Sequence, residues 1–180
     1  MEAIYAIDSK NGLAKNGVIP WKSKKDMSFF MNKTINNVVI MGKNTYFSIP
    51  KQHRPLKNRL NIVFTTNPHV YDIDETEKSN VIFTDNISIH EEILTNTSKY
   101  YNMYKFLNND FKIFIIGGKT IYDHFIPLCD KIWVTRLKCD YDCDLFIDYD
   151  YSGQYKVEIQ EEDDELEIIE YTRLSWNSAE

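Results

Sequence analysis

One carboxylate stands where a loop meets a helix, at a position that suits proton chemistry. Ser23 is a good N-cap, and Asp26 follows it by three residues, as in a capping box. Helical spacing from there predicts one apolar face, made of Met27, Phe30, Met31 and Thr34. Asp26 borders this face, and a carboxylate beside an apolar surface can have a raised pKa and exchange protons. The alternative is that Asp26 only caps its own helix.

Three strand ends carry groups that suit phosphates. Gly117-Gly118-Lys119-Thr120 follows a buried strand and opens a helix, where bare backbone and unpaired N–H groups can hold a pyrophosphate. The pattern is neither G-x-G-x-x-G nor a P-loop, so a tight turn without a ligand is an equal alternative. Gly42-Lys43-Asn44-Thr45 repeats this arrangement, and Thr65-Thr66 closes a third strand. Together they suit a dinucleotide with an extra phosphate, although Lys43 as a plain surface lysine stays an alternative.

One arginine is a candidate carboxylate ligand, whereas metal and covalent chemistry lack the residues they need. Arg59 precedes an apolar strand and can clamp a carboxylate with two parallel hydrogen bonds. The four histidines have no metal or nucleophile spacing, and no G-x-S-x-G motif occurs. Cys139 and Cys143 have no histidine near them, so a zinc site would lack ligands. We therefore expect no metal.

The composition is that of an ordinary globular protein. The 180 residues, 43% hydrophobic and 27% charged, fit one domain with a sizeable core. A net charge of −6 argues against nucleic acid as a partner, because phosphate binders are usually basic. Without a basic leader or a long apolar run, we expect neither a signal peptide nor a membrane span. The odd count of three cysteines then favours reduced thiols and a cytoplasmic location.

Strands alternate with helices along the chain and then give way to a hairpin. The pattern predicts strands at 3–7, 37–42, 60–65, 81–84, 111–116, 131–137, 155–159 and 166–174, the last two facing each other across residues 161–165. It predicts helices at 24–34, 43–49, about 88–107 and from 119, with a weak point at 95–98. Residues 9–22 and 69–80 are predicted loops, and a loop as long as 9–22 in a compact domain is usually functional or disordered. This is an α/β domain with a mostly parallel sheet of about eight strands and about four helices, whose ligands bind at the carboxyl ends of the strands.

In order and spacing, these segments resemble dihydrofolate reductase across nearly the whole chain. The matching segments are Asn11-Gly12-Leu13-Ala14, Ile19-Pro20-Trp21, Asp26 with Phe30, Val39 to Thr45, Ser48-Ile49-Pro50, Pro55 to Arg59, Ile116 to Tyr122, and Asp144-Leu145-Phe146. The resemblance implies a dihydrofolate reductase-like domain over residues 1–174 and a C-terminal tail at 175–180. Ala14 departs from the family, where Gly is usual, and segment 69–110 is longer than in short bacterial members.

The resemblance also implies a reaction. It is the NADPH-dependent reduction of 7,8-dihydrofolate to 5,6,7,8-tetrahydrofolate, by hydride transfer to C6 and protonation of N5. The product supplies one-carbon metabolism and the synthesis of thymidylate and purines. Dihydrofolate and antifolates would be the small-molecule ligands, and the protein would work as a monomer.

Site residues follow from the same resemblance. Catalytic roles fall to Asp26, Trp21 and Thr135. The substrate would contact Ile4, Tyr5, Asp26, Phe30, Ile49, Leu56, Arg59, Ile116 and Tyr122, with Arg59 on the glutamate carboxylate. The cofactor would contact Ala6, Asn11, Gly17, Ile19, Gly42, Lys43, Asn44, Thr45, Thr65, Thr66, Asn67, Ile116, Gly117, Gly118, Lys119, Thr120, Ile121 and Tyr122. In the family a cis peptide joins the two glycines, and residues 11–22 form a mobile lid that Asp144 would pin.

Two other functions stay open at this point. The reductase of riboflavin biosynthesis shares this architecture and uses NADPH, but it would not need Asp26 and Arg59 together. Binding of a diaminopyrimidine antifolate would separate the two enzymes. A catalytically silent nucleotide- or partner-binding module is the other alternative, which a steady-state assay would test.

Overall fold

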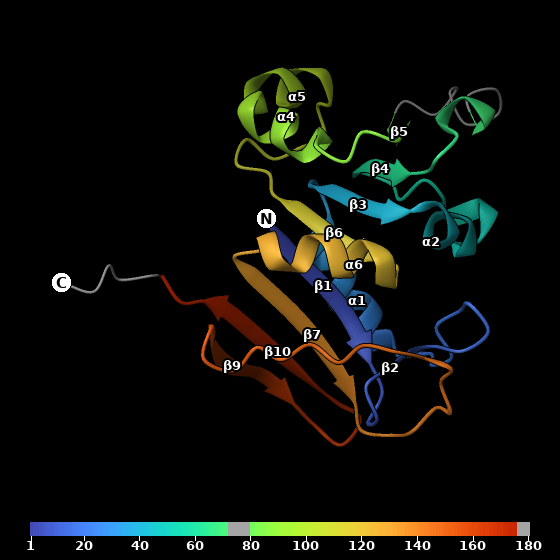
Figure 1. Ribbon diagram of the computed structural model, residues 1–180, viewed down its shortest axis with the longest axis vertical. Coiled ribbons are helices and arrows are strands. Elements are labelled where there is room, and N and C mark those ends of the chain that lie inside the picture. Colours follow the sequence, from blue (N-terminus) through green and yellow to red (C-terminus); the bar gives the residue numbers. More distant parts are fainter. Residues whose placement is uncertain (72–79, 176–180) are drawn as a thin grey trace.

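Six parallel strands make up most of an eight-stranded sheet. The computed structural model describes residues 1–71 and 80–175 (Figure 1). The sheet has the order β5-β4-β3-β6-β1-β7-β10-β9, with the last two strands antiparallel. Its strands are β1 (Glu2–Ile7), β3 (Val38–Gly42), β4 (Leu60–Phe64), β5 (Val81–Thr84), β6 (Ile113–Gly117), β7 (Lys131–Leu137), β9 (Tyr155–Glu162) and β10 (Leu166–Arg173). A small separate sheet pairs β2 (Gly12–Ala14) with β8 (Leu145–Phe146). The predicted architecture is confirmed.

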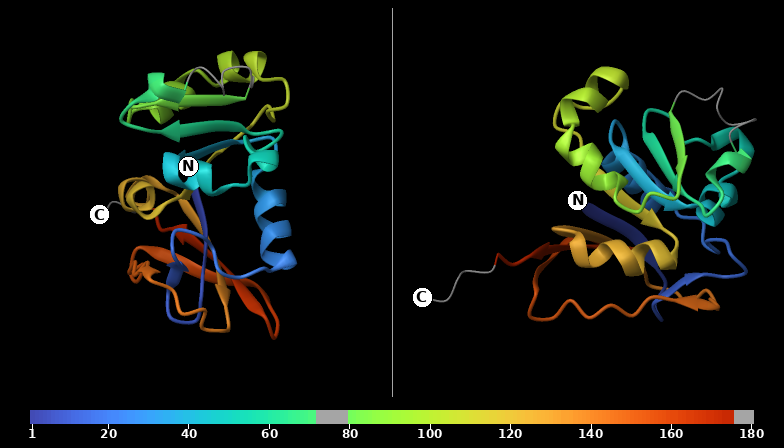
Figure 2. Two further views of the ribbon diagram at one scale, coloured as in Figure 1. Left: turned by 90° about the vertical axis from the view of Figure 1, so that its right-hand side faces the viewer. Right: turned by 45° about the horizontal axis from the view of Figure 1, so that its top comes forward.

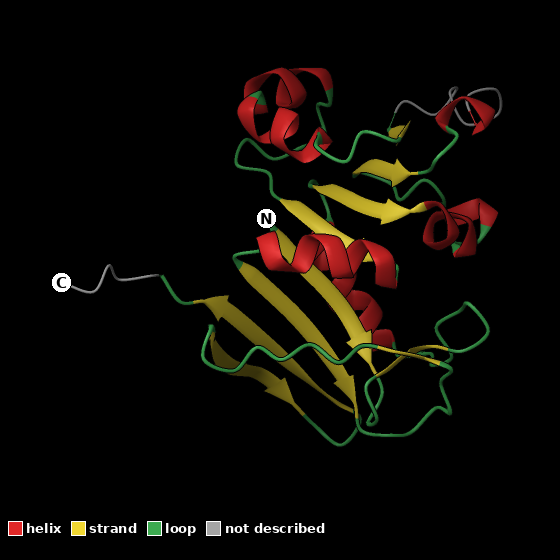
Figure 3. Cartoon of the chain, in the orientation of Figure 1, coloured by secondary structure: helices red, strands yellow, loops and turns green. Residues whose placement is uncertain are grey.

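Helices cover both faces of the sheet (Figure 2). The α-helices in the described residues are α1 (Lys24–Thr34), α2 (Lys43–Ser48), α4 (Ile89–Thr95), α5 (Thr97–Met103) and α6 (Lys119–Phe125). Short 3₁₀ turns lie at Lys51–His53, Pro68–Tyr71 and Ile126–Leu128. Figure 3 places α1 and α6 on opposite sides of the central strands. Each strand of the interior is therefore buried from two sides, which explains its continuous apolar run.

Several predicted boundaries differ from the structure. There are five α-helices in the described residues instead of about four, because the segment predicted at 88–107 divides at Asn96, which has non-helical dihedral angles. Strand β9 extends to Glu162, so the hairpin turn is shorter than the predicted turn at 161–165. Glu161 and Glu162 belong to β9, an exposed edge strand on which charge is readily solvated. Part of the predicted loop 9–22 forms β2. Most of the predicted loop 69–80 lies outside the described residues.

The hydrogen-bond ladder between β1 and β6 ends before the carboxyl end of β1. Its pairing with β7 continues from Glu2 to Ile7, but its pairing with β6 ends at Ala3 opposite Ile115. Beyond that point the carbonyl of Ile4 accepts a hydrogen bond from the hydroxyl of Tyr122, at 2.9 Å. The sheet order changes direction here, since β3 and β7 lie on opposite sides of this pair. In open α/β sheets such a point is where ligands bind.

No helix within the described part of the chain is both long and apolar enough to cross a membrane.

Candidate active site

The first turn of α1 fixes the predicted acid in place. The side chain of Ser23 accepts a hydrogen bond from the backbone N–H of Asp26, at 3.2 Å. The helix begins at Lys24, directly after Ser23, as predicted. The predicted apolar face is only partly buried, because Met27 and Met31 are 58% and 49% exposed. The helix packs through Phe29, whose ring centroid lies 5.8 Å from that of Trp133, and through Phe30. Of the four residues on the predicted face, only Thr34 is fully buried.

Asp26 lies between two hydrogen-bond donors from distant segments. The indole N–H of Trp21 donates to its Oδ2 at 3.4 Å, and the hydroxyl of Thr135 on β7 also bonds to the carboxylate. Burial raises the pKa of Asp26, these two hydrogen bonds lower it, and the negative charge of Glu165 raises it. The net direction is upward. The carboxylate can therefore hold a proton at a higher pH than an ordinary aspartate.

The residues predicted to line the substrate pocket fall mainly into one apolar cluster. Ile4 is buried in it, and the half-buried side chains packed against it include Phe30, Ile49, Leu56 and Ile116. Phe114 and Trp133 form its floor on the sheet. Five of the predicted residues thus lie together on the α1 face, next to Asp26.

Tyr5 and Tyr122, which were also predicted to contact the substrate, are exceptions. Both rings lie in the cluster on the opposite face, with their centroids 5.3 Å apart, and the hydroxyl of Tyr5 bonds to that of Tyr151 at 3.0 Å. For Tyr5 the reason is the alternation of side chains along β1, which sends Ile4 and Tyr5 to opposite faces. Only the backbone of Tyr5 therefore lies at the predicted wall.

Arg59 is a buried cation held by neutral groups. It is 4% exposed, and its Nε donates to the hydroxyl of Thr34 at 2.8 Å. Its terminal nitrogens donate to the carbonyls of Lys57, at 2.9 Å, and Met31, at 3.3 Å. Burial lowers its pKa, and no carboxylate pairs with it in the described residues. Five N–H donors with three partners leave two for an incoming anion.

The strand ends predicted to hold the cofactor meet where β3 and β6 lie side by side. Gly117 and Gly118 are joined by a cis peptide, as the resemblance implied, and Gly117 has a φ of +114° that suits only glycine. A Cβ on Gly118 would stand 3.2 Å from the hydroxyl oxygen of Thr45 on α2. One on Gly42 would stand 3.4 Å from Ile121 of α6. Bare backbone is thus available at both strand ends for close approach of a phosphate.

The remaining predicted cofactor residues lie around these strand ends. Lys43 and Asn44 begin α2, and Lys119 and Thr120 begin α6. The ammonium of Lys119 is engaged by Asp123 at 2.8 Å, whereas Lys43 makes no ion pair with any described residue. After β4, the hydroxyl of Thr65 accepts from the backbone of Asn67 at 3.3 Å, and Thr66 is exposed. Lys43 is therefore the cation available for an added phosphate.

The lid is pinned as predicted. The carboxylate of Asp144 accepts a hydrogen bond from the backbone N–H of Asn16, at 2.8 Å, and its own N–H donates to the carbonyl of Ala14, at 3.0 Å. Gly17 has a φ of +77°, and Ile19 is 62% exposed. At its base, Asn11 accepts from Arg136 at 2.8 Å. The loop has the anchored base and exposed tip of a cover for the strand ends.

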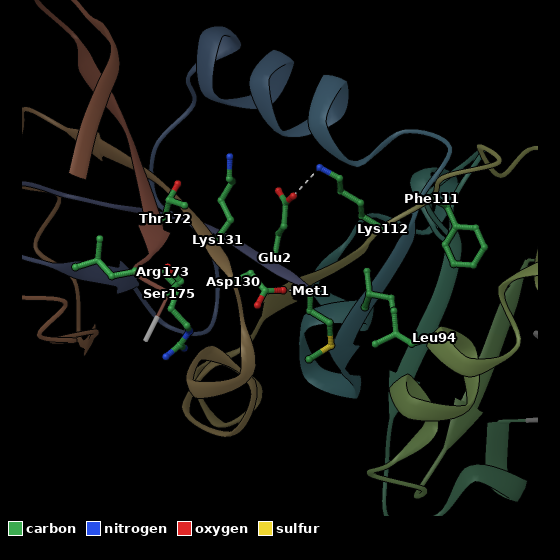
Figure 4. Close-up of a pocket in the computed structure, with 12 residues that line it drawn as sticks. Met1, Glu2, Leu94, Phe111, Lys112, Asp130, Lys131, Thr172, Arg173 and Ser175 are labelled. Atoms are coloured by element: carbon green, nitrogen blue, oxygen red, sulfur yellow. Dashed lines mark hydrogen bonds and ion pairs between the residues drawn. The ribbon is translucent and has the colours of Figure 1, made fainter. Parts of the chain in front are cut away.

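A cavity lies at the other end of the sheet (Figure 4). It measures about 550 Å³ and is lined by the start of β1 and the end of β10, together with Leu94 and Phe111. Its charged groups already have partners, as in the pairs of Met1 with Asp130 and Glu2 with Lys112. Because it faces the amino ends of the parallel strands, we do not assign the chemistry to it.

Two residues behind the lid were not predicted. Asp8 is fully buried and accepts hydrogen bonds from three backbone N–H groups, one of them from Tyr141. The ring of Tyr141 meets that of Trp21 at 5.5 Å. An acid directly after a buried strand was a signal for Asp8, whereas nothing local in the sequence marks Tyr141.

Comparisons with a family model, with known sequences and with solved structures point to one family. A family model described as dihydrofolate reductase matches residues 1–177. A dihydrofolate reductase of Ureaplasma parvum is 33% identical over 153 residues, which cover 85% of each chain. A bifunctional dihydrofolate reductase-thymidylate synthase of Daucus carota is 34% identical over 155 residues, 81% of this chain and 28% of that protein. The solved dihydrofolate reductase of Enterococcus faecalis, complexed with NADP(H) and RAB-propyl, superposes with a TM-score of 0.69 at 27% identity, covering 96% of this chain and 95% of that one.

Proposed function

Because this chain belongs to the dihydrofolate reductase family, we propose that Asp26 and the groups around it carry out the family's reaction here. The chain reduces dihydrofolate to tetrahydrofolate with NADPH. Bound NADPH supplies the hydride, so the protein must place two rings against each other, exclude water and deliver a proton. The observation that carries the proposal is a half-buried acid with a raised pKa, bonded to Trp21 and Thr135 and standing beside the apolar cluster.

Each part of the site has a distinct task in this proposal. Asp26 binds the amino group and N3 of the pterin and helps N5 gain its proton. The apolar side chains around Phe30, Ile49 and Leu56 bury the pterin and the p-aminobenzoyl ring. The two spare N–H groups of Arg59 receive the carboxylate of the glutamate tail, which supplies the counter-charge that this buried cation lacks among the described residues.

Cofactor binding is assigned to the strand ends and the lid. The nicotinamide enters where β1 and β6 separate, next to Ala6, Ile116 and Tyr122. The backbone of Gly117 and Gly118 accommodates the pyrophosphate, because a side chain at either glycine would crowd Tyr122 or Thr45. Lys43 and the hydroxyls of Thr65 and Thr66 serve the adenosine end and its phosphate.

Replacing the acid tests the proposal. Asp26→Asn keeps the size of the side chain but removes the acid, so turnover of dihydrofolate should fall by roughly 10²–10⁴ near neutral pH. Substrate that is already protonated in solution needs no enzymic acid, so the variant should regain activity as the pH falls. Its affinity for NADPH should not change. Asp85→Asn, at an exposed position, is the matched control and should behave as the wild type.

An equal loss of activity at every pH would return Asp26 to the role of a helix cap. A wild-type protein that shows no loss of NADPH absorbance on addition of dihydrofolate would contradict the proposal as a whole. A diaminopyrimidine antifolate should compete with dihydrofolate for the site, because Asp26 would bind both amino-pyrimidine edges in the same way.

We also propose that residues 1–174 work as one domain, with 175–180 as a tail, in a cytoplasmic monomer without nucleic acid as a partner. The acidic net charge of −6 supports the last point. Light scattering on a size-exclusion column should give the mass of one chain, and a mass of two chains would overturn the monomer.

A further inference from the structure

A buried carboxylate ties the base of the lid to the segment that follows β7. Oδ1 of Asp8 accepts from the backbone N–H groups of Lys10, at 2.9 Å, and Gly12, at 2.8 Å. Its Oδ2 accepts from the N–H of Tyr141, at 3.1 Å, and the thiol of Cys143 also bonds to the carboxylate. Burial acts to raise the pKa of Asp8, but these hydrogen bonds outweigh it and lower the pKa. One ionised side chain thus holds two segments more than 120 residues apart in sequence.

These two segments pack so closely that neither can shift along the other. A Cβ on Gly12 would stand 2.4 Å from the Cβ of Cys143, 2.6 Å from its sulfur and 2.8 Å from Oδ2 of Asp8. The backbone N–H of Ser9 also donates to the carbonyl of Cys139, at 3.1 Å. Only glycine fits at position 12, so the arrangement around Asp8 is fixed by packing as well as by hydrogen bonds.

Tyr141 connects this fixed segment to Trp21, which bonds to the acid Asp26. Its ring meets the edge of Trp21 with 5.5 Å between ring centroids, and both pack in one cluster with Leu137, Leu166 and Ile168. The indole N–H of Trp21 in turn reaches Oδ2 of Asp26 at 3.4 Å. That distance lies at the long end for a hydrogen bond, so the position of the indole decides whether the bond persists.

We propose that Asp8 and Tyr141 are positioning residues for the reduction: Asp8 fixes the backbone of Tyr141, and the ring of Tyr141 keeps Trp21 within hydrogen-bond reach of Asp26. The inference rests on the proposed role of Asp26. Neither positioning residue is assigned a contact with substrate or cofactor. Their effect passes through one hydrogen bond of the acid.

Loss of this support has a defined electrostatic consequence. The groups that act on Asp26 are Thr135 on β7 and Trp21, which lower its pKa, and Glu165 before β10, which raises it. The hydroxyl of Tyr122, on α6, also lies within electrostatic range. Once Trp21 withdraws, one of the two lowering contacts is gone and the pKa of Asp26 rises further.

The test is Tyr141→Leu, with Tyr141→Phe as the matched control. Tyr141→Phe keeps the ring and should leave the enzyme unchanged. Tyr141→Leu should move the alkaline limb of the pH profile of kcat upward by up to about one pH unit, because the pKa of Asp26 rises by the order expected for one lost hydrogen bond. Asp8→Asn should act in the same direction, because its NH₂ group would face the N–H of Tyr141.

A second readout follows Trp21 without any turnover. Collisional quenching by acrylamide is measured for each protein, and the contribution of Trp21 is obtained by difference from the same protein carrying Trp21→Phe. Quenching of Trp21 should rise about twofold in Tyr141→Leu and not in Tyr141→Phe. A lower melting temperature with an unchanged pH profile and unchanged quenching would overturn the inference and leave Tyr141 a purely structural residue.

The two readouts separate this inference from the proposed function. If Asp26→Asn behaves as proposed while Tyr141→Leu changes neither readout, the positioning role fails and the proposed function stands. If Asp26→Asn retains full activity, the proposed role of Asp26 fails and the catalytic part of the inference falls with it. Increased quenching of Trp21 would then support only the packing role of Tyr141.

Discussion

Arg59 offers the sharpest test of how the substrate is held. The residue is 4% exposed, and its guanidinium makes three hydrogen bonds, all to neutral oxygens, on Thr34, Lys57 and Met31. Each terminal nitrogen makes one of these bonds and so keeps one N–H, and a carboxylate that binds with both oxygens needs two. The change we consider is Arg59→Lys, which keeps the charge and removes the fork.

The expected loss follows from these contacts. An ammonium cannot present two parallel N–H groups to a carboxylate, so at least one charge-assisted hydrogen bond disappears. Such a bond contributes about 1.5–3 kcal/mol, which corresponds to a roughly 10- to 150-fold weaker Kd for dihydrofolate. The stability of the fold should fall as well, because the oxygens of Thr34 and Met31 lose a buried donor.

The assay compares two ligands in one titration format. Quenching of intrinsic fluorescence gives the Kd of dihydrofolate and of a pteridine without the glutamate tail, below the unfolding temperature of each variant. Only dihydrofolate should bind more weakly to Arg59→Lys. Lys57→Ala, at an exposed side chain, is the control and should change neither Kd. If both ligands lose affinity equally, Arg59 supports the fold and does not touch the substrate.

Three further outcomes are expected. Lys43→Ala should weaken NADPH much more than NADH, because the lysine is assigned to the extra phosphate, and an equal change in the two Kd values would place it elsewhere. Gly117→Ala should destabilise the fold by about 1–3 kcal/mol in thermal unfolding, since φ is +114° and its Cβ would stand 3.0 Å from Tyr122, whereas Gly42→Ala should cost less. Asp26→Asn should be more stable than the wild type at pH 7. Ionised Asp26 is penalised by burial above its raised pKa, and the difference should vanish as the pH falls through that pKa toward the ordinary value of 3.8.

Local patterns were enough to predict most elements. Helix α1 has the predicted limits because Ser23 supplies a cap that acts only on its own first turn. The inner parallel strands β1, β3, β4, β6 and β7 were predictable because burial on both faces demands continuous apolar residues. The break at Asn96 was visible as weak helix propensity, but whether two short helices or one long one would form depends on packing against the sheet.

The site was predictable only in part. The resemblance named Asp26, Thr135 and Arg59, yet a list of residues does not say which way each side chain points. Alternation along β1 places Tyr5 on the face away from Ile4, although the resemblance assigns both to the substrate pocket. The support from Asp8 through Tyr141 to Trp21 joins distant parts of the chain, and no local pattern in a single sequence contains such information.

The position of β1 in the sheet has a consequence for how the molecule is made. Both of its neighbours, β6 and β7, come from the second half of the chain, and the lid is anchored by residues as late as Asp144 and Ile147. During synthesis the N-terminal strand therefore has no partner until more than 110 further residues have emerged. Closing such long loops is slow, because their entropy is lost before any contact rewards it. Strand β1 is made before both of its partners and is thus among the last strands to be secured, and a fragment that ends before β6 should neither fold nor retain the cofactor.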